Sequence, residues 1–545
     1  MSNTRGARKD SIKRILEEMP LTAEIYWLLR QRSKTAESRF QLKGLHQALQ
    51  TIVPTAQEYR QSAAPGKKLF IFANVHYWIE HTALLGLALA AQGHNVTLGF
   101  YPYADGETPV SRLDLRRQNE YAEHVLELAA PLLETASFLR KKASYVYLPD
   151  ELQSALAEVS HYDVQYIQQS ENMDEEGDLY QLRMERNRDA AKTAFAYLSE
   201  ARPDAVIIPN GSFLEPGAVY RVARFLGIPT TTYEFSELRD RIWIAHDDEV
   251  LHQDTDALWR GCQGKPLFPE QREQLNALMS SRRQGKSWEM AGGTWQGAES
   301  KGGEVARNVL GLDSRPIVLL PTNVLGDSFS IGRQIFSRNM EEWLTRTVQY
   351  FTGRSDVQLI VRIHPGEVLS HGASILNILR QMLPSPPENI HLIGPQDPIS
   401  TYDLIEIADA GLVYTTTVGL EMAMSGLPVV VSGKAHYRGR GFTSDPDSWV
   451  SYYKTLNQIL ADPAGHRLQP VQVERACRYA YYFFLAFPRP FPWHLSHIWE
   501  DYAAHPLESV LSQEGEALYG DTWRYLTGEP IDWERIVDEG YAVQA

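Results

Sequence analysis

Short apolar runs alternate with longer amphipathic stretches along much of the chain. Between residues 67 and 250 the apolar runs predict strands and the amphipathic stretches predict helices. The runs are apolar at consecutive positions, which is typical of parallel strands covered by helices on both faces. The predicted strands are residues 69–73, 95–100, 205–208 and 229–233, and the predicted helices are residues 82–91 and 218–226.

The same alternation returns between residues 304 and 465. Two blocks of this kind predict an α/β protein with two Rossmann-like domains that face a cleft, because open parallel sheets bind ligands at the carboxyl ends of their strands. The predicted strands of the second block are residues 317–320, 358–361, 390–393, 411–414 and 428–431, and its helices lie at about 333–350, 372–383, 401–409 and 418–426.

The remaining segments are predicted to be helical or irregular. Residues 1–66 form an N-terminal helical segment, about 110–200 a polar helical insertion in the first domain, and 466–545 a C-terminal helical segment. Residues 251–303 are rich in Gly, Gln, Ser and Arg and lack periodicity, so we expect a linker with at most short helices.

The composition of the 545-residue chain narrows the class of protein. Its length and its 43% hydrophobic content suit two globular domains. Cys262 and Cys477 are its only cysteines, which excludes a disulfide framework and a four-cysteine zinc site. The net charge of −15 argues against broad nucleic-acid binding.

No apolar run reaches the length of a bilayer span, and the first residues lack a signal-peptide core, so the sequence predicts a cytoplasmic protein. Residues 1–45 hold ten basic and five acidic side chains. This segment either lies on an anionic membrane surface, as a peripheral contact with the inner membrane, or packs on the protein's own core.

The sequence GLVYTTTVGLEMAMSG carries the main candidate chemistry. A strand runs into Thr415, Thr416 and Thr417 and then directly into a helix. Helix-end amides without an internal partner, together with hydroxyl groups, form a phosphate seat. Gly419 would allow close approach of the backbone. Glu421 lies one turn further on the same face, where it can reach the hydroxyl groups of a ribose.

A second candidate is VRIHP, at the end of another apolar strand. Pro365 ends the strand and projects His364 at the sheet edge, where a histidine can donate to a phosphate and, when protonated, offset its charge. Arg362 lies on the same side of that strand. Further donor-side candidates in loops at this edge are Asn323, Ser328, His436, Arg438 and Arg440.

The first domain should supply the other wall of the cleft. Asn210, Gly211 and Tyr233 follow or end its strands and are candidates on the acceptor side. Glu234 and His76 are equally well placed as a general base, and the sequence does not choose between them.

The segment from VRIHP to TYDLIEIADAGLVYTTTVGLEMAMSGLPVVVSGKAHYRGRGFT resembles the capsule polysaccharide biosynthesis proteins. These are bacterial glycosyltransferases of the two-Rossmann (GT-B) type, with relatives that transfer Kdo or sialic acid from CMP-activated donors. The resemblance covers about residues 315–450 and, more weakly, 68–100 and 203–245. It implies that His364 and the three threonines bind the phosphate of the donor and that Glu421 faces its ribose.

The resemblance implies a metal-independent glycosyltransferase that uses a CMP-, UDP- or GDP-linked sugar as co-substrate and needs no other cofactor. The acceptor would be a growing surface polysaccharide or its lipid-linked form. Asp254, Thr255 and Asp256 match the D-x-D pattern of metal-dependent sugar transferases, but no apolar strand precedes them, so we predict no metal site. The alternatives are a sugar-nucleotide 2-epimerase and a non-catalytic nucleotide-sugar-binding subunit of a polysaccharide assembly complex.

Overall fold

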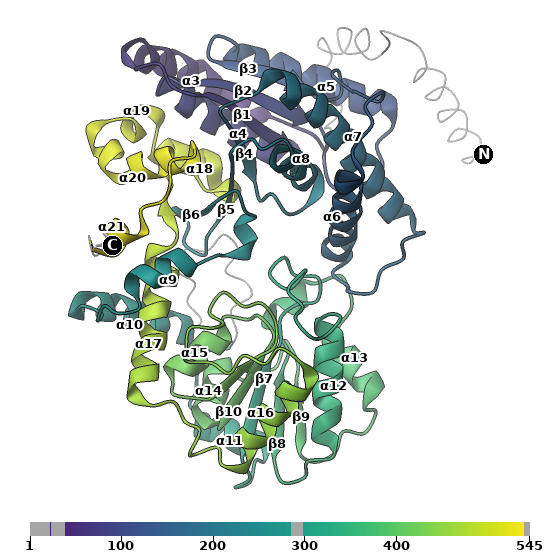
Figure 1. Cartoon of the computed structure of the whole chain (residues 1–545), viewed down its shortest axis with the longest axis vertical. Helices are drawn as coiled ribbons and strands as arrows, with labels where there is room; N and C mark the ends of the chain where they lie inside the picture. The colour runs from purple at the N-terminus through teal and green to yellow at the C-terminus, as the bar shows by residue number, and fades with distance from the viewer. Residues whose placement is uncertain (1–21, 23–38, 285–297, 539–545) are drawn as a thin grey trace.

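A computed structural model describes residue 22 and residues 39–284 and 298–538 of the chain. The described residues form two α/β lobes, one around each of two sheets (Figure 1). The prediction of two Rossmann-like domains that face a cleft is confirmed, because residues at the carboxyl ends of both sheets line a common cavity. The prediction for residues 1–45 falls mostly outside the described residues.

The N-terminal lobe is built on a sheet with the strand order β12-β6-β5-β4-β1-β2-β3. The strands from β3 to β5 are parallel, and β6 and β12 extend the β5 edge in antiparallel fashion. The central strands are buried on both faces, as their continuous apolar runs predict. The strands are β1 (Lys68–Asn74), β2 (Asn95–Tyr101), β3 (Leu133–Ser137), β4 (Ala205–Pro209), β5 (Thr230–Phe235), β6 (Arg241–His246) and β12 (Arg489–Pro490).

Helices cover this sheet, and the predicted helical insertion also contributes strand β3 to it. Helices α6 and α7 of the insertion form a hairpin that extends toward the second lobe (Figure 1). The helices of the lobe are α3 (Lys43–Ser62), α4 (His76–Ala91), α5 (Arg112–Leu126), α6 (Asp150–Gln168), α7 (Asp178–Ala201) and α8 (Leu214–Phe225), with short 3₁₀ turns at η1 (Glu127–Ala129) and η2 (Val250–His252).

The C-terminal lobe has an all-parallel sheet with the strand order β11-β10-β7-β8-β9. Its strands agree with the predicted ones to within a residue at each end: β7 (Ile317–Pro321), β8 (Gln358–Arg362), β9 (Ile390–Ile393), β10 (Ala410–Val413) and β11 (Val429–Val431). Its helices are α11 (Gly303–Leu310), α12 (Met340–Thr352), α13 (Ile375–Met382), α14 (Thr401–Ile407), α15 (Val418–Met424) and α16 (Trp449–Ala461), with a 3₁₀ turn at η3 (Pro365–Leu369).

The segment between the lobes contains α9 (Asp256–Cys262) and α10 (Pro269–Arg283). The prediction of at most short helices is wrong for α10, which has 15 residues. Proline suits the first helical position, and the buried side chains of Leu275 and Leu278 lie on one face, three residues apart. The segment therefore contains a helix that packs on one side only, and its many polar residues led to the prediction of a linker.

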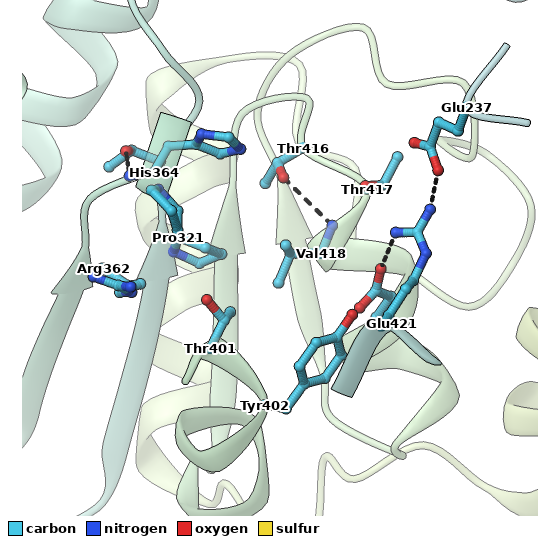
Figure 2. Close-up of a pocket in the computed structure, with 13 residues that line it drawn as sticks. Glu237, Pro321, Arg362, His364, Thr401, Tyr402, Thr416, Thr417, Val418 and Glu421 are labelled. Carbon is cyan, nitrogen blue, oxygen red and sulfur yellow. Dashed lines mark hydrogen bonds and ion pairs between the residues drawn. The ribbon is translucent and has the colours of Figure 1, made fainter. Parts of the chain in front are cut away.

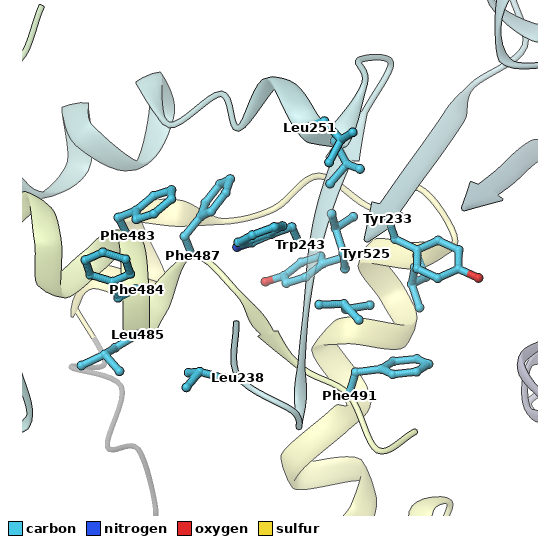
Figure 3. Packing of buried hydrophobic residues seen from close by; sticks show 14 of the residues in the cluster. Tyr233, Leu238, Trp243, Leu251, Phe483, Phe484, Leu485, Phe487, Phe491 and Tyr525 are labelled. Atoms are coloured by element: carbon cyan, nitrogen blue, oxygen red, sulfur yellow. The ribbon is translucent and has the colours of Figure 1, made fainter. Parts of the chain in front are cut away.

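The C-terminal tail crosses back to the N-terminal lobe. Strand β12 pairs with β6, and Phe491 and Tyr525 of the tail pack near Tyr233 and Trp243 of the sheet (Figure 3). The tail contains α17 (Pro470–Tyr481), a π-helical turn η4 (Tyr482–Ala486), η5 (Leu495–His497), α18 (Ile498–Ala504), α19 (Leu507–Val510), α20 (Gln513–Leu526) and α21 (Trp533–Asp538). Among the described helices, none has both the length and the apolar character needed to cross a bilayer.

The α6–α7 hairpin also touches the second lobe. The carboxylate of Glu171 accepts the backbone N–H groups of Met340 at 3.0 Å and Glu341 at 2.6 Å, which are the first amides of α12. The ring of His371 donates to the carbonyl of Ile167 at 3.0 Å. These contacts hold the end of α6 beside the carboxyl edge of the second sheet.

A buried ion cluster fixes α6, α7 and α8 relative to β1. Arg183 is fully buried and contacts Asp163 at 3.1 Å and Glu215 at 3.0 Å, and both carboxylates are also fully buried. Asp163 accepts the backbone N–H of Leu214 at 2.6 Å, and Asn74 at the end of β1 donates to Glu215. The Arg183 cluster thus joins these helices through ion pairs and hydrogen bonds. The pattern of hydrophobic residues in the sequence does not predict these contacts.

Candidate functional site

Two adjoining cavities lie at the carboxyl edges of the two sheets. The small cavity has a volume of about 170 Å³ and is lined mainly by the C-terminal lobe. The large cavity has a volume of about 550 Å³ and lies between the lobes. His364, Thr416 and Thr417 line both cavities and therefore form a shared wall. Figure 2 shows Arg362 and His364 on one side of the small cavity and the threonines and Glu421 on the other.

His364 follows β8 in a fixed orientation. Its backbone N–H donates to Thr322 Oγ1 at 3.1 Å, and its Nδ1 accepts the N–H of Gly366 at 3.0 Å. The ring proton of the neutral form is therefore on Nε2. Burial, with a further contribution from Arg362, lowers the pKa of His364 to about 4. The predicted protonated ring is thus disfavoured at neutral pH, and the neutral ring has its N–H group at Nε2.

Arg362 and Arg282 both line the small cavity, and only Arg362 has no carboxylate paired with its guanidinium among the ion pairs of the described residues. Its side chain is 1% exposed, and Nη1 donates to the carbonyl of Gly394. Nε and Nη2 have no partner within the described part of the chain. Burial lowers the pKa of the guanidinium, and the charge of Asp397 offsets this effect in part. Two unpartnered N–H groups on a buried guanidinium fit a bound anion such as a phosphate.

The threonine segment contributes hydroxyl groups more than helix-end amides. Helix α15 has seven residues, and the N–H groups of Val418 and Gly419 already donate to Thr416, at 3.4 Å to Oγ1 and at 3.1 Å to the carbonyl. The predicted seat of free amides is therefore not present at these two positions. The hydroxyl of Thr415 is buried without a partner in the described structure, and Thr417 makes no side-chain cap.

Gly419 serves packing, which corrects its predicted role. A Cβ atom at this position would lie 2.3 Å from the Tyr437 hydroxyl and 2.9 Å from Val413. The Tyr437 hydroxyl donates to the carbonyl of Thr416 at 2.7 Å. The absence of a side chain thus admits the tyrosine that holds the threonine segment, and Gly419 is not among the residues that line either cavity.

Glu421 lines the small cavity but already has a cationic partner that the sequence analysis missed. Arg282 on α10 donates to Glu421 at 2.9 Å and to Glu237 of the N-terminal lobe (Figure 2). These two carboxylates raise the pKa of Arg282 against the effect of burial. Arg282 thus joins both lobes at the cavity, and a ribose at Glu421 would share the carboxylate with it. The only sequence feature that pointed to Arg282 was the basic end of α10, in a segment that the sequence predicts to be a linker.

The N-terminal lobe places Glu234 in the wall of the large cavity. Its carboxylate accepts a hydrogen bond from Asn210 Nδ2 at 3.0 Å and from the backbone N–H of Phe235 at 3.0 Å. Burial raises the pKa of Glu234 despite these bonds. A carboxylate with a raised pKa at a cavity wall is suited to general-base chemistry.

Three other predicted residues of this lobe are not among those that line either cavity. The His76 ring packs edge-on against Phe40 and Tyr77. Tyr233 is buried, with its hydroxyl 3.2 Å from Nδ1 of His81. Gly211 has φ of 81° and abuts Thr232. Of the two candidate bases, only Glu234 is therefore at the cavity.

The predicted site residues in the loop after β11 have two different roles in the structure. His436 lines the large cavity, with its ring stacked on Phe483 at 3.6 Å. Arg438 donates to the carbonyls of Val431, Asp445 and Pro446, and Arg440 pairs with Asp256 at 2.6 Å. Neither arginine lines a cavity, so the structure places both in structural contacts, and Asp256 of the D-x-D sequence is held by one of them.

The remaining predicted residues lie at the cavities. Asn323 and Ser328 line the large cavity, and Asn323 accepts the backbone N–H of Thr415 at 3.4 Å. Pro365 lines the small cavity. The large cavity also has an aromatic lining that was not predicted as a group, although VHYW directly after β1 was a signal for it. Its aromatic residues are Tyr77, Trp78, Tyr166, Phe213, Phe235, Trp243, Phe329 and Phe483.

Two Rossmann-like lobes with cavities at the carboxyl edges of both sheets define the GT-B-like class of fold. No family model matches the chain, and no curated protein matches it. Solved structures with a similar fold include KpsC, a β-Kdo 2,4 transferase from Thermosulfurimonas dismutans, at 18% identity and a TM-score of 0.35, covering 53% of this chain and 82% of that one.

Two other solved structures represent the two kinds of enzyme considered from the sequence. The calicheamicin glycosyltransferase CalG4 is 15% identical, with a TM-score of 0.24, and the match covers 77% of this chain and 95% of that one. The UDP-GlcNAc 2-epimerase from Neisseria meningitidis, bound to UDP-GlcNAc, is 12% identical, with a TM-score of 0.25, and covers 77% of this chain and 100% of that one. Values this low concern the fold alone and carry no argument about activity.

Proposed function

We propose that the protein is a glycosyltransferase that moves a sugar from a nucleotide-activated donor to a growing capsule or other surface polysaccharide. The nucleoside would bind in the small cavity, the phosphate at the shared wall, and the sugar and acceptor in the large cavity. The observation that carries this proposal is that His364, Thr416 and Thr417 line both cavities. A phosphate bound there would join a nucleoside on one side to a reacting sugar on the other.

In the proposed chemistry the C-terminal lobe stabilises negative charge and the N-terminal lobe accepts a proton. Arg362, the Nε2–H of His364 and the threonine hydroxyls would stabilise the departing phosphate as negative charge develops on it. Glu234 would take the proton of the acceptor hydroxyl. Arg362 supplies the positive charge in this scheme, so the proposed transfer is metal-independent. The lobes would exclude water, since hydrolysis of the donor is the competing reaction.

The donor in this proposal is a CMP-, UDP- or GDP-linked sugar, and the acceptor is a polysaccharide or its lipid-linked form. We place the reaction in the cytoplasm, with residues 1–45 as the segment that contacts the membrane. A thermal-shift screen against CMP, UDP and GDP tests the nucleotide, because a ligand that binds the folded state raises the apparent stability. Failure of all three nucleotides to raise it would contradict the proposal.

A sugar-nucleotide 2-epimerase is the second candidate, and one observation favours it. Asp327 of the C-terminal lobe lines the large cavity together with Glu234, and burial raises the pKa of both carboxyls. Such a pair could act as acid and base on a single sugar. Incubation with radiolabelled nucleotide sugars separates the functions: label in an oligosaccharide supports the transferase, an isomerised donor supports the epimerase, and binding without turnover supports a non-catalytic subunit.

Replacing Arg362 by Met tests the proposed phosphate contact. We expect binding of the best nucleotide to weaken about 10- to 100-fold, because charge-assisted hydrogen bonds contribute about 1.5–3 kcal/mol. The melting temperature should stay level or rise, since the side chain leaves Nε and Nη2 unpartnered in the described structure. Calorimetry and thermal unfolding measure the two effects.

The matched control is Arg338→Met, a substitution of an exposed arginine in the same lobe that lines neither cavity. It should leave nucleotide affinity unchanged. Full affinity in the Arg362 variant would remove this guanidinium from the phosphate site.

A further inference from the structure

Two tyrosines at the large cavity are half-exposed although they belong to its wall. Tyr77 on α4 is 42% exposed and Tyr166 on α6 is 44% exposed. The Tyr166 ring is stacked on Phe213 at 5.0 Å and 23°. A ring that is backed by another aromatic side chain and open to a cavity offers a flat apolar face to a ligand.

Polar groups surround these rings. Asn210, Glu234 and Asn323 line the same cavity, and Gln253 and Asp327 add to them. After burial, the charge of Glu234 and the nearby Tyr77 and Asp327 contribute to raising the pKa of Tyr166 to about 12. Tyr166 therefore shares the cavity with carboxylates of both lobes, and the cavity lining combines aromatic side chains with hydrogen-bonding groups.

Three residues beside this wall have a strained backbone conformation. Val75, Asn210 and Leu214 have positive φ angles of 53°, 62° and 57°, which residues other than glycine rarely adopt. Such a conformation is unfavourable by itself and persists only where the surroundings of the residue fix it. Here Asn210 donates to the Tyr233 carbonyl at 2.8 Å, and Leu214 is bound by the Arg183 cluster.

The strained residues are neighbours in sequence of the groups that line the cavity. Val75 lies two residues before Tyr77, Asn210 binds Glu234, and Leu214 follows Phe213. Strain of this kind gathers at functional sites, where it orients side chains before a ligand arrives. Tyr77, Phe213 and Glu234 are thus each close in sequence or hydrogen-bonded to a residue with a positive φ angle, and Phe213 in turn stacks on Tyr166.

We infer that the wall formed by Tyr77, Tyr166, Phe213, Asn210 and Glu234 is a saccharide-binding subsite, which rests on the proposed transferase function and would hold the acceptor sugar. The C–H face of a sugar ring is apolar and its rim carries hydroxyl groups, so it matches flat aromatic faces bordered by amides and carboxylates. Such a ring stacked on these tyrosines would bring a hydroxyl group toward Glu234. A lipid chain would leave the amides and carboxylates without partners.

The test uses the full-length protein and an array of purified bacterial surface oligosaccharides of three or more sugars. The best-retained oligosaccharide is then titrated by calorimetry against the wild type, Tyr77→Ala and Tyr166→Ala. We expect each alanine variant to weaken its binding at least about fivefold, because the stacked face is lost. Tyr166→Phe keeps the face and should change it less than about twofold.

Two controls separate this inference from the proposed function. Tyr145→Ala removes a tyrosine that is 86% exposed and lines neither cavity, and it should bind the oligosaccharide as the wild type does. The nucleotide that gives the largest thermal shift should bind all variants equally. If the oligosaccharide binds but no nucleotide does, the transferase proposal fails while the saccharide subsite stands.

Three results would overturn the saccharide subsite. The first is a wild-type protein that retains no oligosaccharide of the array. The second is retention that survives both alanine substitutions. The third is a loss of nucleotide affinity in Tyr77→Ala and Tyr166→Ala at unchanged melting temperature, which would assign these rings to the nucleotide.

Discussion

Glu234→Gln is expected to lower kcat about 10²- to 10⁴-fold, which is the range that a general base contributes. Glutamine keeps the shape of the side chain, and its oxygen can still accept from Asn210, as the carboxylate does at 3.0 Å. The lost step is removal of the acceptor proton. Initial rates with the labelled donor and acceptor measure the effect, and nucleotide affinity should be unchanged, because Glu234 does not line the small cavity.

The pH dependence of activity is a second test of Glu234 as the general base. A base acts in its deprotonated form, and burial raises the pKa of Glu234 above the ordinary value of 4.5. Activity should therefore fall as the pH drops through this raised pKa, and the acid limb of kcat/KM should lie above pH 4.5. The glutamine variant should lose that limb.

Asp327→Asn is the matched control, since this carboxyl also lines the large cavity and has a raised pKa. In a transferase it should retain most of the turnover and the acid limb. Equal losses in both variants would favour the epimerase, and a wild-type kcat in Glu234→Gln would exclude this residue as the base.

Arg183→Met is expected to reduce the free energy of unfolding by about 3–5 kcal/mol, because it leaves two buried carboxylates without their cation. Arg183, Asp163 and Glu215 are each fully buried. The loss should also free Leu214 and Asn74, which the two carboxylates bind at the edge of the large cavity. Urea unfolding measures the change.

Two further variants isolate the cause. Arg188→Met changes an exposed arginine on the same helix and should cost less than about 0.5 kcal/mol. Adding Asp163→Asn and Glu215→Gln to Arg183→Met removes the uncompensated charges and should restore part of the stability. A stability loss below about 1 kcal/mol for Arg183→Met alone would show that water, and not the arginine, compensates these carboxylates.

Most of the fold was predictable because its signals are local. Continuous apolar runs located every strand of the second sheet to within a residue at each end, since a strand buried on both faces needs such a run. Strand β3, with the sequence LETAS, was missed because it is a polar edge strand. Helix α10 was missed because it has few apolar positions and because the Gly- and Ser-rich composition of residues 251–303 as a whole concealed its good helix formers.

The location of a candidate-site residue was predictable where it depends on how close the residue is to the end of a strand. Arg362 ends strand β8, and His364 and the threonines follow strands. The carboxyl ends of parallel strands meet at one edge, so these residues lie together at the cavities. Arg438, Arg440 and His76 have the right residue types at similar places. Their partners are loop carbonyls, Asp256 and Phe40, and no periodicity reports such contacts.

The sequence by itself determined two α/β lobes and the strand-end residues that line the cavities, because alternating apolar strands and helices specify which ends of the strands converge. Only the tertiary structure decided that Arg282 reaches Glu421, 139 residues away, that Gly419 makes room for Tyr437, and that tyrosines of separate helices border one cavity. Such contacts depend on how whole elements pack and on which charges burial forces into pairs, and these are properties of the assembled lobes and not of any local segment.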